Sequence, residues 1–258
     1  MNYKHYIAIL ILIVLAFVPR LYRIDNPVAD WHSWRQADTA AVSRNFVKDS
    51  FNPLFPKFDS FYALNQVADD NPERYFFAEF PIYNILTYIP YSLFEVNVIY
   101  ARLVSVLAST IATVLLYLLV KRYSSARVAF IAATVFAILP FNVYYGRVVM
   151  PDPLHIMFTI LALYLVSVWT QNSAEYQSTK TKRQKHISAW DSIPASRYFL
   201  PSLAGLATTG MLLTKPYGLV IGIPIAYLIL RTWGLKALKK PSIYVYALVS
   251  LIPFLLWR

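Results

Sequence analysis

Long apolar segments separated by polar stretches dominate the hydropathy pattern of this chain. Six of them approach the roughly twenty residues of a membrane-spanning helix. The fifth is long enough for two short helices, with a break near Lys215-Pro216, because proline interrupts a helix. We therefore predict an all-α fold, a polytopic membrane helix bundle of about seven spans that forms one domain over residues 1–258. The apolar segments lie at about 6–22, 98–120, 127–146, 153–170, 199–230 and 242–257.

Two polar stretches between the spans are longer than simple connectors. Residues 23–97 form the first, and an ordered loop of that length generally serves a function. Within it, residues 38–46 predict the start of an amphipathic helix with Asp38 near its N-terminus, and residues 81–94 predict an interfacial helix. The second stretch, residues 171–198, is predicted to be a solvated loop.

Composition and charge support a membrane protein and set its orientation. The chain is 58% hydrophobic and 14% charged, too apolar for a soluble globule, and its lack of cysteine excludes disulfides and thiolate chemistry. With the N-terminus in the cytoplasm, thirteen basic and two acidic residues fall on the cytoplasmic side, which thereby holds the whole net charge of +11. The basic excess therefore indicates topology and not nucleic-acid binding. Residues 23–97 become extracytoplasmic, and residues 171–198 cytoplasmic.

The same topology places ionisable residues from distant segments on the extracytoplasmic face. Ionisable groups at the edge of a membrane are expensive and usually functional. We therefore expect a single site there, built from Asp30, His32, Arg35, Asp38, Glu79, Arg147, Asp152 and Lys215.

Structural roles compete with functional ones at several of these positions. Asp38 and Asp152 each lie where a predicted helix begins, and a carboxylate there stabilises the helix N-terminus. Lys215 must either extend to the interface or meet an anion. Glu79, embedded among aromatic residues, requires a cation, a metal or a proton. His155 suits either a metal ligand or a hydrogen bond within the bundle.

Four motifs in this order carry a resemblance to a known family: HSWRQADTAAVSRNF, AEFPIYNIL, GRVVMPDPLHIMF and GLATTGMLLTKPYGL. Together they resemble the integral-membrane glycosyltransferases of the GT-C class, specifically the protein-mannosyltransferase-like group with the aminoarabinose and Rgt-type transferases. The resemblance covers essentially the whole chain, but only the N-terminal portion of the usual family length. Many members have an adjacent Asp-Glu pair where this chain has Arg35-Gln36. Asp30 and Asp38 are both candidates for the family's acid, and Asp38 is preferred.

The resemblance implies transfer of a sugar from a polyprenyl-phosphate donor, held partly in membrane lipid, to a hydroxyl of a protein, lipid or polysaccharide acceptor. Transfer would proceed with inversion at the outer face of the inner cell membrane. The expected catalytic carboxylates are Asp38 as general base, then Asp152 and Asp30. The expected substrate- and phosphate-binding residues are Arg35, Arg147, Lys215 and His32. Glu79 and His155 are the residues expected to hold a divalent metal cation.

Two other classes of function compete with the transferase. One is a transporter or flippase for a lipid-linked or anionic solute, and the other is an inactive assembly subunit. Transporters tend to contain inverted repeats and helices broken at the membrane midplane. The sequence shows no internal repeat, and its ionisable residues gather at one face. These observations favour the enzyme.

Overall fold

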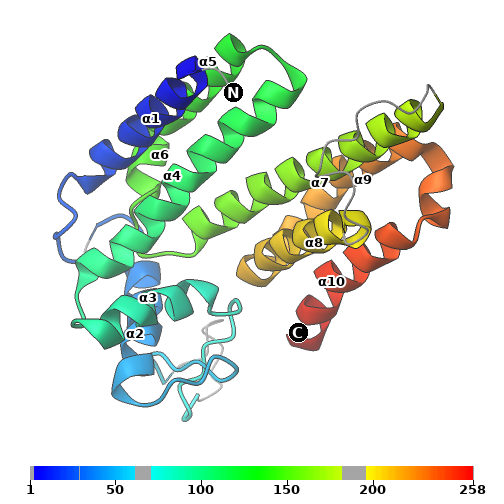
Figure 1. Ribbon diagram of the computed structural model, residues 1–258. Coiled ribbons are helices and arrows are strands. Elements are labelled where there is room, and N and C mark those ends of the chain that lie inside the picture. The colour runs from blue at the N-terminus through cyan, green and yellow to red at the C-terminus, as the bar shows by residue number, and fades with distance from the viewer. Residues whose placement is uncertain (1–2, 29, 62–70, 182–195, 258) are drawn as a thin grey trace. The chain divides into compact units, whose positions relative to one another are not determined.

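The computed structural model of the chain describes residues 3–28, 30–61, 71–181 and 196–257. Within these ranges the chain is helical and has no strand; Lys57 and Tyr75 form an isolated antiparallel bridge. The all-α prediction is therefore confirmed for this part of the chain (Figure 1). The α-helices are α1 (Tyr3–Phe17), α2 (Ser33–Lys48), α3 (Ile82–Leu93), α4 (Val98–Tyr123), α5 (Ala126–Ile138), α6 (Pro140–Tyr145), α7 (Asp152–Thr181), α8 (Ser196–Thr214), α9 (Gly222–Trp233) and α10 (Pro241–Trp257). The 3-10 helices are η1 (Val18–Leu21), η2 (Pro216–Ile221) and η3 (Gly234–Lys239).

Several helices are apolar enough to cross a membrane. Four are also long enough, namely Tyr3–Leu21, Val98–Tyr123, Asp152–Gln171 and Pro216–Lys239. Three shorter apolar helices cover Ala126–Ile138, Tyr198–Thr214 and Pro241–Trp257. These helices support a multi-pass membrane protein, while the number of spans and the side of the N-terminus stay predictions.

Proline explains where the apolar segments break. The predicted interruption near Lys215 is confirmed, because α8 ends at Thr214 and η2 begins at Pro216. Residues 127–146, predicted as one helix, are two: α5 ends before Leu139, and α6 begins at Pro140. Pro140 has no N–H for the carbonyl four residues earlier. The side chain of Asn142 donates to that carbonyl instead, from Nδ2 to Phe136 O at 3.0 Å.

The structure divides into two compact units. The first contains Met1–Met157 with Leu213–Lys215, and the second contains Phe158–Leu212 with Pro216–Arg258. In the first unit α1, α4 and α5 pack side by side around a core of Leu12, Tyr117, Ala129 and Ala133. Small residues such as alanine let helices approach closely where lipid surrounds them.

A buried arginine donates hydrogen bonds to backbone carbonyls on both sides of the break between α5 and α6. Arg20, in η1, is completely buried and donates to the carbonyls of Ala16 at 2.5 Å, Ala137 at 3.0 Å and Asn142 at 3.1 Å. Its guanidinium thus binds carbonyls near the end of α5 and within α6, where helix hydrogen bonding is interrupted. Arg20 therefore fixes the chain direction into residues 146–152.

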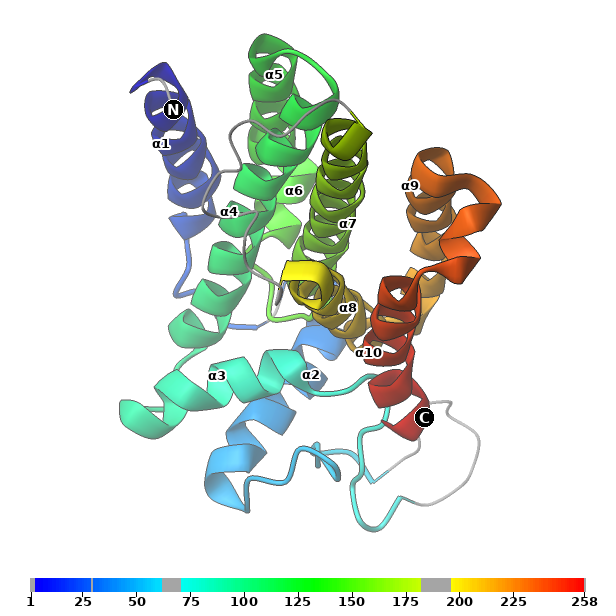
Figure 2. The ribbon, with the colours of Figure 1, turned by 45° about the vertical axis from the view of Figure 1, so that its right-hand side comes forward.

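The described part of the first loop, residues 23–28, 30–61 and 71–97, is built around two helices. The amide of Asn84 in α3 donates to the Thr39 carbonyl at 2.7 Å and the Ser43 hydroxyl at 2.9 Å in α2. Figure 2 shows these two helices crossing next to each other. Helix α3 confirms the helix predicted over residues 81–94. The apolar side of α2 contributes Ala41, Val42 and Phe46 to a small core that Phe58 and Phe76 complete.

The start of α2 corrects the sequence prediction. The helix begins at Ser33 and not near Asp38, which lies in its second turn. The residue before the helix, His32, has a left-handed backbone conformation (φ 58°) and makes no side-chain capping bond. Because no conventional cap marks this end, the pattern does not reveal it. Asp38 therefore has no capping role.

The second unit contains most of α7 and α8 together with α9 and α10. Its core gathers Trp169, Ala204, Ala207, Trp233 and Tyr246 among other residues. Helices α8 and α10 lie side by side, and Thr209 donates to the Val249 carbonyl at 2.6 Å (Figure 2). Helix α7 extends to Thr181, into the stretch predicted as the cytoplasmic loop; residues 182–195 of that stretch lie outside the described residues.

Candidate functional site

A buried ion pair joins α2 to the segment just before α3. Arg35 lies in the first turn of α2, and Glu79 lies three residues before α3. Nη2 of Arg35 is 2.5 Å from both carboxylate oxygens of Glu79, and both side chains are about nine-tenths buried. The Arg35 guanidinium also stacks on the Phe76 ring, 4.9 Å from its centroid. Arg35 is therefore occupied by protein groups on two sides.

A second, looser pair lies next to the first. Nζ of Lys215 is 3.6 Å from Oδ2 of Asp152, the first residue of α7. That oxygen is buried and makes no hydrogen bond within the described structure. The backbone around Lys215 is anchored nearby, because the amide of Phe80 donates to the Leu213 carbonyl at 3.0 Å.

The two pairs lie close enough for the charges of one to act on the other. Burial raises the pKa of the Glu79 carboxyl, the charges of Arg35 and Lys215 lower it, and the charge of Asp152 raises it. We call Arg35, Glu79, Asp152 and Lys215 the charged quartet. Its members come from the four sequence motifs, and the structure brings these four of the eight predicted residues together. His155 lies beside the quartet, with Nδ1 3.4 Å from Oγ1 of Thr214.

A hydrogen-bond network around Gln36 joins the first loop to the segment before α7. Gln36 is completely buried; its Nε2 donates to Asp30 Oδ1 at 2.6 Å, and its Oε1 accepts from the Val149 amide at 3.0 Å. Arg102 Nη2 lies 4.0 Å from Asp30 Oδ2. The Tyr144 hydroxyl donates to the Trp31 carbonyl at 3.2 Å in the same network. Asp30 is therefore held by partners on two sides.

Asp38 differs from the other carboxylates. It is half-buried in α2, and no hydrogen bond or ion pair engages it within the described structure. Burial raises the pKa of the Asp38 carboxyl, Arg35 lowers it, and Asp59 raises it. An accessible carboxylate with a raised pKa is a suitable proton acceptor.

The other two predicted substrate-binding residues lie outside the quartet. Arg147 is half-buried, donates to the Tyr22 carbonyl and has its guanidinium 5.8 Å from the Tyr144 ring centroid. His32 is exposed, with its ring 5.9 Å from that of Trp31 and 6.2 Å from that of Tyr145. Neither contacts Arg35 or Lys215 through any bond described in the structure.

A metal site at Glu79 and His155 stays a prediction. Among the described residues, no three His, Cys, Asp or Glu side chains group as metal ligands would. Both oxygens of Glu79 face Arg35, so a cation there would have to compete with a guanidinium.

Three functional candidates were missed by sequence reasoning: Gln36, Arg102 and Arg20. Arg102 is one turn inside an apolar span, and such a charge is itself a signal of function or buried pairing. It is 1% exposed and donates to the carbonyls of Arg23 at 3.1 Å and Ile24 at 3.0 Å. Arg20 is likewise a charged residue at the end of an apolar segment. Gln36 is neutral, so its sequence position gives no such signal.

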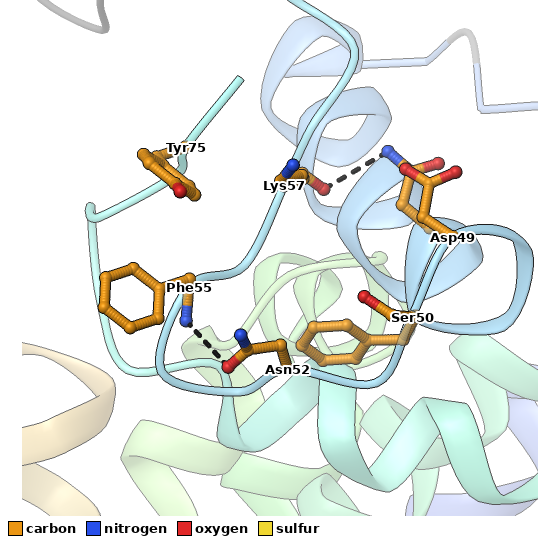
Figure 3. A pocket seen from close by; sticks show the side chains of 8 residues that line it. Asp49, Ser50, Asn52, Phe55, Lys57 and Tyr75 are labelled. Carbon is orange, nitrogen blue, oxygen red and sulfur yellow. Dashed lines mark hydrogen bonds between the residues drawn. The ribbon is translucent and has the colours of Figure 1, made fainter. Parts of the chain in front are cut away.

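The structure also contains a cavity of about 240 Å³ at the C-terminal end of α2 (Figure 3). No residue predicted to belong to the site lines it. Its lining residues are Asn45, Phe46, Asp49, Ser50, Asn52, Phe55, Lys57 and Tyr75.

The apolar helices and the charged quartet together indicate the general class of membrane protein to which the chain belongs. Apolar helices long enough to span a membrane accompany a cluster of four charges, one pair buried and one half-buried, beside the helices α2 and α3 of the first loop. This combination is typical of polytopic membrane proteins that act on polar or charged substrates at the membrane surface.

Comparison with known proteins narrows that class. Residues 78–178 match the family model described as dolichyl-phosphate-mannose-protein mannosyltransferase. No curated protein and no solved structure matches the chain. The match confirms the resemblance to protein mannosyltransferases over a segment that includes Glu79, Arg147, Asp152 and His155. The match covers less than half of the chain, and the apolar helices separately support a multi-pass membrane protein.

Proposed function

We propose that this protein transfers a sugar from a polyprenyl-phosphate-linked donor to a hydroxyl acceptor at the extracytoplasmic face of the cell membrane, with inversion at the anomeric carbon. The charged quartet is the observation that carries the proposal. The buried Arg35–Glu79 pair is costly to desolvate, and the half-buried Lys215–Asp152 pair adds two more charges from distant motifs, which supports a use for the cluster. The family match supplies the class of reaction.

Asp38 is the general base in this proposal. It accepts the proton of the acceptor hydroxyl as the hydroxyl oxygen attacks the anomeric carbon and the bond to the lipid phosphate breaks. Its raised pKa strengthens it as a base, and no described partner competes for its oxygens. Asp30 is less suited, because the Gln36 amide already donates to it at 2.6 Å. Asp152 is less suited too, because it faces Lys215.

Lys215 is the strongest candidate for stabilising the departing phosphate. Its side chain is 15% exposed and its ammonium is only loosely paired with Asp152, so it can exchange that contact for a phosphate oxygen. Arg147, half-buried and without a carboxylate partner in the described structure, is the second candidate. Arg35 instead positions Glu79, since both carboxylate oxygens already lie at 2.5 Å from it.

Transfer assays in proteoliposomes test the proposal. The wild-type protein, Asp38→Asn and Asp30→Asn are supplied with a panel of polyprenyl-phosphate sugars and with peptide, lipid and saccharide hydroxyl acceptors. Loss of a general base typically lowers the rate about 10²- to 10⁴-fold, so Asp38→Asn is expected to fall by this amount. Asp30→Asn, a matched change in the same loop, is expected to lose less.

Two outcomes would contradict the proposal in different ways. Undiminished transfer by Asp38→Asn would remove Asp38 as the base while leaving the transferase intact. Movement of labelled donor across the bilayer by the wild-type protein, without transfer to any acceptor, would replace the transferase with a flippase.

A further inference from the structure

The cavity at the end of α2 has the chemistry of a small-molecule site. Its volume of about 240 Å³ lies just below the ~300–1,000 Å³ of pockets that hold drug-sized ligands, so it suits a ligand of about one ring. It lies wholly within the first loop, between the end of α2 and the strand-like segments around Lys57 and Tyr75 (Figure 3).

Two polar side chains point into this cavity with their donors available. Oδ1 of Asn52 accepts from the amides of Leu54 at 3.2 Å and Phe55 at 3.3 Å, which fixes the orientation of the side-chain amide. Its Nδ2 therefore points toward the open space, as Figure 3 shows. The Ser50 hydroxyl points into the same space and makes no hydrogen bond within the described structure. A hydroxyl both donates and accepts.

The charges that line the cavity are balanced by partners. Asp49 pairs with Arg74 at 3.0 Å, and Lys57 lies 3.6 Å from Glu73. No excess charge of either sign is thus directed at a ligand. The lining favours a neutral molecule with several hydroxyl groups over a phosphate or a cation.

Aromatic rings complete the lining. Phe55 and Tyr75 have ring centroids 5.6 Å apart, and half of the Phe55 surface is exposed. The electron-rich face of an aromatic ring attracts the weakly positive C–H bonds of an apolar molecular face. A sugar ring has such a C–H face and carries hydroxyls around its edge, which matches rings beside amide and hydroxyl groups.

A residue that lines the cavity lies on the same face of α2 as Asp38, the proposed catalytic base. Asp38 and Asn45 are seven residues apart in α2, about two turns and ~10 Å along the axis, so both lie on one face of the helix. Asn45 lines the cavity, and it donates to Asp59, whose charge raises the pKa of Asp38. A ligand in the cavity would therefore occupy the same side of α2 as Asp38.

We propose that this cavity binds a neutral saccharide unit of the acceptor, one or two units from the hydroxyl that reacts. The saccharide stacks on Phe55 and Tyr75 and hydrogen-bonds to Asn52 and Ser50. The acceptor role rests on the proposed transferase activity, whereas saccharide binding itself does not. The inference narrows the acceptor from any hydroxyl compound to a glycan.

Saturation-transfer NMR on the whole protein in nanodiscs tests binding directly. The probes are methyl glycosides of glucose, galactose, mannose and rhamnose, with inorganic phosphate and short-chain phosphatidylglycerol as alternatives. We expect saturation transfer to at least one glycoside. Phe55→Ala and Asn52→Leu should each weaken its binding by tenfold or more. Phe94→Ala, which removes another exposed phenylalanine (70% exposed) outside the cavity, should leave it unchanged.

The outcomes separate this proposal from the proposed function. Binding of no glycoside by the wild-type protein, equal binding by Phe55→Ala, or binding of phosphate or phosphatidylglycerol alone would overturn the saccharide site. Glycoside binding that is lost in Phe55→Ala but retained in Asp38→Asn supports the site even if sugar transfer is never detected. Where transfer is detected, Phe55→Ala should raise the KM for a glycan acceptor and leave the KM for the donor unchanged.

Discussion

Replacing Glu79 with glutamine would leave the Arg35 guanidinium buried without its closest counter-ion. The two side chains are 11% and 7% exposed and 2.5 Å apart. At an effective dielectric constant of ~20, their attraction is about 7 kcal/mol, and desolvation of several kcal/mol per ion offsets most of it. The intact pair thus contributes little net stability. Loss of one partner, in contrast, costs about 3–5 kcal/mol, because the remaining charge stays buried.

Thermal unfolding in detergent measures this cost. Glu79→Gln is expected to lower the Tm on the order of 10 °C for a chain of this size. The double variant Arg35→Met/Glu79→Leu should recover most of the loss, since apolar residues of similar volume can replace a buried pair. Glu73→Gln, which breaks the exposed pair with Lys57, should change stability by less than about 1 kcal/mol.

The double variant decides whether the reasoning is right. A Tm for Glu79→Gln equal to that of the wild type would show that the pair is neither buried nor tight. A double variant less stable than Glu79→Gln would show that the charges stabilise the loop beyond their mutual neutralisation. Recovered stability without recovered sugar transfer would assign the pair a role in the reaction in addition to its structural one.

Two further predictions concern single positions. Because burial raises the pKa of Asp38 in the folded protein, its ionisation opposes folding. Asp38→Asn should therefore raise the Tm slightly at neutral pH, and the gain should vanish on acidification as wild-type Asp38 becomes protonated. A Tm series between about pH 7 and pH 4 checks this, and a gain that persists at low pH would contradict it. A Cβ at Gly146 would collide with Arg20 Nε and, at 2.6 Å, with the Asn142 carbonyl, so Gly146→Ala should cost about 1–3 kcal/mol in the same assay. Gly222→Ala, with nothing within 4 Å of the new Cβ, should be neutral or slightly stabilising, and equal effects of the two changes would refute the proposed contact.

The helical segments were predictable where hydropathy and proline agree. The break at Pro216 and the helix after Pro81 both follow from the chemistry of proline, and both are confirmed. The break at Pro140 was predictable on the same grounds, yet the continuous apolar run around it concealed the interruption. The start of α2 was not predictable, because His32 enters the helix from a left-handed conformation without a capping bond.

For the site, the sequence allowed a prediction of which residues gather but not of which residues pair. Hydropathy and charge counting placed the residues of the quartet on one face, and the structure brings Arg35, Glu79, Asp152 and Lys215 together. Which residues pair was not predictable, since Arg35 meets Glu79 through the packing of a loop, and the sequence pattern does not show how the chain after α2 returns to that helix. Arg102 was overlooked because an average over a long apolar window hides one charge.

Arg35 and Gln36, which stand where the resemblance leads one to expect an adjacent Asp-Glu pair, are both engaged by contacts of this loop. Arg35 needs an anion and finds Glu79, while the Gln36 amide donates to Asp30 and accepts from the Val149 amide. A carboxylate at position 36 would still accept from Val149 but would face Asp30, 2.6 Å from the present Nε2, with like charge. Asp30 and Gln36 thus form a matched pair that holds the loop. A carboxylate free to accept a proton is then found one and a half turns into α2, at Asp38, where no such partner engages it within the described structure.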